Sequence, residues 1–269
     1  MATVAENLQR IIQAKADIKE AIENKGVQVG DGTIDTYADY INDIQQGEGG
    51  ETKPKIPNGL TFKGSTMGTF DMNPYDWSDH YFCQNLFEEC RNLQRLENVP
   101  EDWKPYGTTA YMFNNCILLN EAPMMDMSCV GNTERMFEGC NSLTSIPQYN
   151  MHYVANATYM FNSCRALQSI PQLDFTNMRD CFNMLWQIKT DCTLGGFTNI
   201  RCNLNIYPIS DINHNSFMNV INGLYDFTGN GIVPDNTEGN LTINPFSENK
   251  ISDEEKAIAT SKGWKITVS

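Results

Sequence analysis

The sequence predicts an α+β fold in which short coils of chain stack into an irregular solenoid, preceded by a short N-terminal helical module. Three observations support this prediction: a segment of about 24 residues recurs, the N-terminus shows helical spacing of apolar residues, and a stretch without apolar residues separates the two. We expect four parts. They are a helical module (1–47), a linker (48–55), the solenoid with its N-terminal cap (56–215) and a C-terminal capping region (216–269).

The internal repeat is the strongest signal in the chain. Its common form is Met-Phe-x-x-Cys-x-x-Leu-x-x-Ile-Pro, and four copies start at Leu86, Met112, Met136 and Met160, which are 26, 24 and 24 residues apart. We expect a degenerate fifth copy to begin at Cys181, 21 residues further on. A period of this size is typical of one solenoid coil, because a single coil cannot bury its apolar side and has to stack on its neighbours.

The apolar residues of the repeat are expected to form ladders through a shared core. No histidine or carboxylate recurs beside the cysteines, so we interpret the thiols as packing groups that stay reduced and buried. The Met-Phe-x-x-Cys part should form a helical turn, and the Leu-x-x-Ile-Pro part a short strand that proline closes. The predicted repeat core consists of Phe87, Cys90, Met112, Phe113, Cys116, Met136, Phe137, Cys140, Met160, Phe161 and Cys164.

Both flanks of the repeat are expected to close the array. Gly59–Ser65, with the aromatic residues that follow, is interpreted as an N-terminal cap or an imperfect first coil. On the other side we expect a helix over 216–225, a strand over 241–243, and a second helix. That helix should begin after a Ser252 cap with acidic residues in its first turn and end near Ser261, before a strand over 265–268.

The N-terminal module carries an apolar seam with heptad spacing. The seam consists of Val4, Leu8, Ile11, Ile18 and Ile22, interrupted by Lys15, and a second short helix is expected through Tyr37–Ile44. Three heptads alone are marginal in water, so the first helix needs copies of itself or an adjacent element. Two interpretations stay open: a parallel homo-oligomeric bundle, and a hairpin packed on the rest of the chain.

Composition excludes several classes of function. Acidic residues outnumber basic ones by 33 to 19, a net charge of −14, so we expect no nucleic-acid partner. No stretch approaches the ~20 apolar residues of a membrane span, and the N-terminus does not resemble a signal peptide. The nine cysteines form no Cys-x-x-Cys pair, so neither a zinc site nor a disulfide framework is expected. We predict no enzyme activity, catalytic residue, cofactor or metal.

Aromatic residues between the ladder positions are the candidate recognition surface. Tyrosine on a rigid scaffold suits recognition of a glycan or a protein, since the ring is apolar and the hydroxyl polar. The alternative is that these side chains cover the edges of the coils. The candidates are Trp103, Tyr106, Tyr111, Tyr149, Tyr153 and Tyr159.

The repeat resembles the BspA-like leucine-rich repeats of bacterial surface proteins over residues 60–185, although Leu86 and Cys181 replace its Met and Leu185 replaces its Cys. Residues 216–226 and 257–264 are similar to segments that close such repeats in phage and prophage proteins of gut bacteria. Residues 18–44 resemble the N-terminal virion-attachment segment of phage fibre and tail proteins. The first likeness implies adhesion to a surface, and the last implies attachment to a virion.

These resemblances imply a fibre-type structural protein of a phage virion, made in the host cytoplasm. It would attach to other virion proteins through its N-terminal helices, form a homotrimer by analogy with fibres, and display the solenoid for binding to a host-surface glycan or protein. Two rivals remain: a structural adaptor or decoration protein that contacts only other virion subunits, and a bacterial surface adhesin.

Overall fold

The computed structural model describes residues 16, 18–20, 53–57, 59–77, 82–234 and 238–269. The chain divides into two compact units, Met1–Pro54 with Pro74–Asp76 and Lys55–Asn73 with Trp77–Ser269. In the first unit, Ala16 and residues 18–20 are helical, and Ile18 is half-buried. The other seam residues, Val4, Leu8, Ile11 and Ile22, lie outside the described residues, as does the second expected helix. Among the described helices, none has the length and apolar character needed to cross a membrane.

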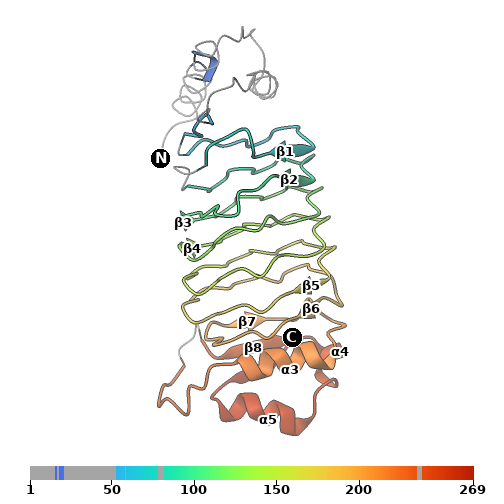
Figure 1. Ribbon diagram of the computed structural model, residues 1–269. Helices are drawn as coiled ribbons and strands as arrows, with labels where there is room; N and C mark the ends of the chain where they lie inside the picture. Colours follow the sequence, from blue (N-terminus) through green and yellow to red (C-terminus); the bar gives the residue numbers. More distant parts are fainter. Residues whose placement is uncertain (1–15, 17, 21–52, 58, 78–81, 235–237) are drawn as a thin grey trace, which may run out of the picture. The chain divides into compact units, whose positions relative to one another are not determined.

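The second unit is built from coils that lie one on the next, and we call residues 59–73 and 82–205 the coil stack (Figure 1). Short parallel strand pairs join successive coils on one side, and others do so on the opposite side. The first side holds β1 (Thr69–Asp71) with β2 (Arg95–Glu97) and β5 (Ser169–Ile170) with β6 (Thr193–Leu194); the second holds β3 (Gly107–Thr108) with β4 (Val130–Asn132). Single parallel bridges continue both sides, such as Glu121 with Ser145 and Asn132 with Asn156.

The Met-Phe-x-x-Cys segments do not form the expected helical turns. Each forms two successive four-residue turns together with the three residues before it: in the second coil Met112 N donates to Thr109 O at 3.1 Å, and Cys116 N donates to Phe113 O at 3.0 Å. The third residue of each turn is left-handed, with φ of 59° at Tyr111 and 60° at Asn115. This is the pattern of a type II turn, and a left-handed residue interrupts a helical path. The equivalent left-handed residues in other coils are Asn85, Glu89, Arg135, Gly139, Tyr159, Ser163, Asn183 and Gln187.

The fifth copy of the repeat has a different register from the one expected. Phe161 N donates to Met184 O at 3.0 Å, just as Phe137 N donates to Met160 O at 3.0 Å. Met184, which follows Met160 by 24 residues, therefore occupies the Met position, and Leu185 the Phe position. The prediction that this copy begins at Cys181 was wrong, because it aligned residue types rather than backbone hydrogen bonds.

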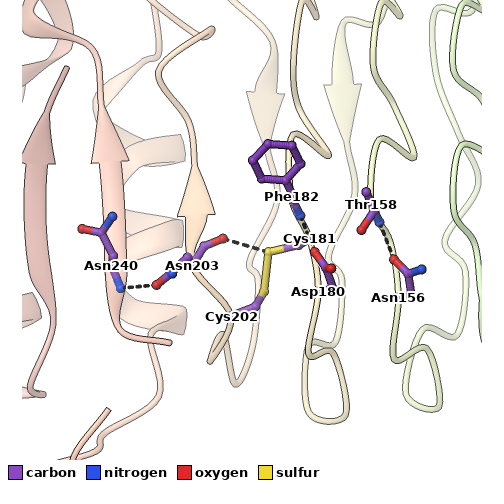
Figure 2. The surroundings of a disulfide bond; sticks show 8 residues. All are labelled: Asn156, Thr158, Asp180, Cys181, Phe182, Cys202, Asn203 and Asn240. Carbon is purple, nitrogen blue, oxygen red and sulfur yellow. Dashed lines mark hydrogen bonds between the residues drawn. A yellow bond between two sulfur atoms is a disulfide. The ribbon is translucent and has the colours of Figure 1, made fainter. Parts of the chain in front are cut away.

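Polar side chains at one corner of the coils hold this register. Asn156 Oδ1 accepts from Thr158 N at 2.9 Å, and Asp180 Oδ1 accepts from Phe182 N at 2.9 Å (Figure 2). Asn132 does the same for Glu134 N at 2.9 Å, four residues before Met136. Such local acceptors fix the start of a turn, so each coil enters its two turns at the same place.

Phenylalanine rings form a continuous ladder through the coil stack. The rings of Phe62, Phe87, Phe113, Phe137 and Phe161 stack in order, with centroid distances of 5.5, 5.5, 5.5 and 6.0 Å. All except Phe62 have no exposed surface. Because Phe62 N also donates to Leu86 O at 2.6 Å, Gly59–Ser65 forms an imperfect first coil.

The ladder cysteines are buried free thiols that each bond to the coil before them. Cys116 Sγ donates to Phe87 O at 3.0 Å, and Cys140 and Cys164 repeat this contact one and two coils further on, each at 3.1 Å. Cys90 does the same to Phe62 O at 3.0 Å. Each phenylalanine carbonyl already accepts from its own turn, so the thiol satisfies its second lone pair. Cysteine thus combines small size with a donor.

The C-terminal part of the chain closes the stack with a small sheet and three helices (Figure 1). The parallel sheet consists of β7 (Leu204–Asn205), β8 (Asn240–Ile243) and β9 (Lys265–Val268). The helices are α3 (His214–Gly223), α4 (Pro245–Glu248) and α5 (Asp253–Ser261). The expected serine cap is confirmed: Ser252 and Glu255 form a capping box at the start of α5.

Two adjacent glycines provide a matched test of how closely the coils approach. A Cβ on Gly195 would lie 2.5 Å from the carbonyl carbon of Pro171 and 2.6 Å from Gln172 N, both backbone atoms of the previous coil, whereas a Cβ on Gly196 would meet nothing within 4 Å. We expect Gly195→Ala to lower the free energy of unfolding by about 1–3 kcal/mol. Gly196→Ala should change it by less than about 0.5 kcal/mol. Urea unfolding followed by circular dichroism measures both, and equal midpoints would contradict the close packing.

Candidate recognition surface

A shallow hollow lies beside the β3–β4 pair of the coil stack. Its volume is about 500 Å³, and we call it the tyrosine slot. Two tyrosines with mostly exposed side chains, Tyr106 (61%) and Tyr153 (59%), contribute to its lining. Gly107, Ser128, Cys129 and Gly131 supply the rest of the lining.

The slot spans three coils, with small residues between two aromatic ones. Tyr106 precedes β3, and Gly131 lies in β4. Tyr153 lies in the next coil, just before Ala155, whose N donates to Gly131 O. Neighbouring strands lie roughly 4.8 Å apart, so equivalent positions two coils apart are separated by about 10 Å. A Cβ on Gly131 would make only ordinary contacts, at 3.6 Å from Gly107 O and 3.9 Å from Tyr153 O. Packing therefore does not demand glycine there, and its absent side chain leaves the hollow open.

The polar groups that the slot offers to a ligand are uncharged, because the charged side chains near it are paired with each other. The hydroxyls of Tyr106 and Tyr153 make no hydrogen bond to another described residue. Lys104 Nζ lies 2.9 Å from Asp126 Oδ2, so its charge is paired. Hydrogen bonds from Ser128 and Lys104 lower the pKa of Asp126 to about 2. Two free phenolic hydroxyls and two exposed rings thus remain for a ligand.

Two of the predicted surface residues are buried, so these predictions were wrong. Trp103 and Tyr149 are each only 2% exposed. The Trp103 ring packs 5.9 Å from that of Trp77. Tyr149 lies 6.4 Å from the Phe137 ring and donates its hydroxyl hydrogen to Pro123 O at 2.7 Å. A buried tyrosine needs such a partner for its hydroxyl, and the neighbouring coil provides it.

Tyr111 and Tyr159 lie outside the tyrosine slot and enclose an arginine. The Arg135 guanidinium carbon is 5.8 Å from the Tyr111 ring centroid and 4.5 Å from that of Tyr159. Arg135 Nη1 lies 2.7 Å from Glu138 Oε2. Glu138 also accepts from the amides of Asn114 (3.2 Å) and Asn162 (2.6 Å). Because these groups contact one another across three coils, we assign the two tyrosines to the structure of the stack rather than to recognition.

Cys181 and Cys202 form a disulfide, although the number and spacing of the cysteines did not indicate a disulfide framework (Figure 2). Cys181 lies three residues before the Met position of its coil, where Thr109, Thr133 and Ala157 lie in earlier coils and are buried. The correct register of the fifth copy was the missing signal, since it places Cys181 on the inward side facing the next coil. Among the described residues, no group of three or more His, Cys, Asp or Glu side chains could hold a metal ion.

One known protein family matches a stretch that includes most of the coil stack. Residues 81–193 match the family described as "Mycoplasma protein of unknown function, DUF285". The DUF285 match contains all five copies of the repeat and the tyrosine slot, and it ends at the first residue of β6. The family is related to the BspA-like repeats, which agrees with the likeness of the repeat. No curated protein and no solved structure matches the chain.

Proposed function

We propose that the chain is a virion fibre-type protein of a phage that attaches through its N-terminal helices and displays the coil stack for binding to a host-surface glycan or protein. The observation that carries the binding role is the tyrosine slot. The side chains of Tyr106 and Tyr153 are 61% and 59% exposed. By contrast, the ladder rings from Phe87 to Phe161 have no exposed surface. Exposed aromatic pairs of this kind are typical of contact surfaces.

Adsorption to cells tests this role. Fluorescently labelled full-length protein is expected to bind cells of at least one species in a panel of gut bacteria, measured by flow cytometry. The double substitution Tyr106→Ala/Tyr153→Ala should weaken binding at least tenfold, which corresponds to about 1.4 kcal/mol. Phe182→Ala is the matched control, because Phe182 is 58% exposed but does not line the slot. Absence of adsorption throughout the panel would favour the adaptor, and equal binding by the double variant would exclude the slot.

Assembly through the N-terminal seam is tested by solution mass. Light scattering is expected to give a trimer for the full chain and a monomer for a chain that starts at Lys55. Ile11→Asp/Ile18→Asp should abolish the trimer and leave the circular dichroism of the coil stack unchanged, since a buried carboxylate disrupts an a/d seam. Two monomers would favour the hairpin and an adaptor that assembles only on a virion.

The Cys181–Cys202 disulfide favours one second candidate, an exported bacterial surface adhesin. Disulfides persist in oxidising compartments and are rare in the reducing cytoplasm where phage proteins fold. Antibodies raised against the coil stack separate the two candidates. Labelling of purified phage particles supports the fibre protein, whereas labelling of the surface of uninfected cells supports the adhesin.

A further inference from the structure

A second hollow lies where the coil stack meets the C-terminal end of α3, and we call it the amide cleft. Its volume is about 570 Å³. Gln172 and Asn199 come from the coils, Asn222 from α3, and Tyr225, Asp226 and Asn230 from the segment after α3. The cleft is remote in sequence from the tyrosine slot, with no lining residue in common.

Two glycines shape the cleft in opposite ways. A Cβ on Gly223 would collide with the carbonyl oxygen of Phe197, so the end of α3 lies directly on the backbone of the coil. A Cβ on Gly196 would meet nothing within 4 Å. The first glycine therefore fixes the helix against the coil, whereas the second leaves open space in the lining that packing does not fill.

Hydrogen bonds to neighbouring residues orient the polar side chains of the cleft. Asn199 Nδ2 donates to Thr176 Oγ1 at 2.8 Å, and Asn230 Nδ2 donates to Asp226 O at 2.6 Å. Asp226 Oδ1 accepts from Gly229 N at 2.6 Å. The amide oxygens of the two asparagines and Asp226 Oδ2 make no other hydrogen bond to a described residue. Three acceptors are thus held in place for a ligand that brings donors.

Asn222 adds a group that both donates and accepts. Its side chain is exposed and makes no hydrogen bond to a described residue, while its backbone carbonyl accepts from Lys262 Nζ at 2.9 Å. The lysine ties down the end of α3 without contributing to the lining of the cleft. The Asn222 amide therefore projects from a fixed backbone.

The charge of the cleft narrows the class of ligand. Asp226 is the only charged residue in the lining, which contains no lysine, arginine or histidine. A phosphate or carboxylate would be repelled by Asp226. Lys262 and Arg201 lie outside the lining, where the carbonyls of Ile221 and Asn222 hold the first and the Tyr225 ring contacts the second. A single carboxylate among amides is also a poor set for a divalent cation, which favours several carboxylates. Hydroxyl groups match the lining, because each one donates and accepts.

The apolar part of the lining suits the carbon face of a sugar ring. The half-buried Tyr225 contributes an aromatic ring to it beside the amides, whereas Leu224 and Phe197, only 3% and 2% exposed, add little accessible surface. Polar and apolar groups are therefore both within reach of one ligand. Small-molecule sites combine an apolar wall with a few oriented polar groups in this way. We propose that the amide cleft binds one sugar residue of a neutral glycan, through hydroxyl contacts to Asn199, Asn222 and Asp226.

This inference goes beyond the proposed function, since it requires neither a virion nor the tyrosine slot. Saturation-transfer NMR of the full chain tests it with the methyl glycosides of glucose, galactose, mannose, fucose and N-acetylglucosamine, and with methyl glucuronide as the anionic probe. We expect transfer to at least one neutral glycoside and none to the glucuronide. Transfer to none of the neutral glycosides, or to the glucuronide with equal strength, would overturn the proposal.

Substitutions locate the bound sugar. Asn222→Ala is expected to weaken binding about fivefold, the loss of one hydrogen-bonding group. Asn215→Ala is the matched control, because Asn215 is an exposed asparagine on the same helix that does not line the cleft. Tyr106→Ala/Tyr153→Ala should leave glycoside binding unchanged, whatever it does to cell adsorption. Equal binding by Asn222→Ala, or loss in the tyrosine double variant, would show that the sugar binds elsewhere.

Discussion

Raising the pH above about 8.5 is expected to destabilise the coil stack steeply, because its buried thiols resist ionisation. Burial raises the pKa of Cys83 and Cys192 to about 12 and raises the pKa of the Cys116, Cys140 and Cys164 thiols as well. A cysteine in the unfolded chain has a pKa near 8.5. Below that pH the thiols are protonated in both states and add no pH dependence. Above it, the unfolded chain releases protons that the folded chain retains.

Each such thiol then lowers the free energy of unfolding by about 1.4 kcal/mol per pH unit. Five thiols together amount to about 7 kcal/mol per unit, which is comparable to the whole stability of a typical domain. We therefore expect the chain to unfold between about pH 9 and 10.5, and circular dichroism measures this transition. The decline continues until the pH reaches the raised pKa values of the folded state.

A double substitution isolates the thiols from the tyrosines and lysines that also ionise in this range. In Cys140→Ala/Cys164→Ala, the fall in unfolding free energy between pH 8.5 and 9.5 should be about 2 kcal/mol smaller than in the unsubstituted chain, by urea titration at each pH. Slopes are compared rather than absolute values, because the lost methyl-sized volume also affects stability. Equal slopes would show that the thiols ionise in the folded chain.

Phe137→Ala is expected to lower the free energy of unfolding by about 3–5 kcal/mol. Phe137 has no exposed surface, and its ring lies 5.5 Å from that of Phe113 and 6.0 Å from that of Phe161. The substitution removes these two ring contacts and that to Tyr149 at 6.4 Å, and leaves a cavity in the middle of the ladder. Because each coil contacts only its neighbours, the urea transition should also broaden as the two halves lose cooperativity.

Phe182→Ala provides the comparison for this effect. Phe182 is 58% exposed, and its ring contacts that of Tyr159 at 5.6 Å without belonging to the ladder. We expect its free energy of unfolding to change by less than about 0.5 kcal/mol. Similar losses for the two variants would contradict a core that depends on the ladder.

The ladder residues could be predicted from the sequence because stacking gives equivalent positions equivalent surroundings. Phe113, Phe137 and Phe161 each meet the same ring above and below, so the same residue type recurs and the repeat is visible. The turn type was not predictable. The left-handed positions are occupied by Tyr111, Arg135 and Tyr159 as well as by small residues, although bulky side chains rarely adopt this conformation.

The recognition surface could be predicted only in part, because residue type does not say on which side of a coil a side chain lies. Tyr149 and Tyr153 are four residues apart, yet one is 2% and the other 59% exposed. One usable signal was the separation of Tyr106 and Tyr153, 47 residues, which is close to two coils. The amide cleft had no such signal, since its residues come from the coils and from the closing segments together.

The hydrogen bonds between coils make the length of this protein adjustable. Phe113 N donates to Met136 O and Phe137 N to Met160 O, at 2.9 and 3.0 Å, so both surfaces of a coil offer the same groups to its neighbours. A duplicated copy of residues 136–159 would therefore find matching partners on either side. Gain or loss of a 24-residue unit by recombination in the gene would change the length of the coil stack in steps of about 4.8 Å. The closing segments would stay the same. Spacing between a binding site and its point of attachment can thus evolve separately from the chemistry of either.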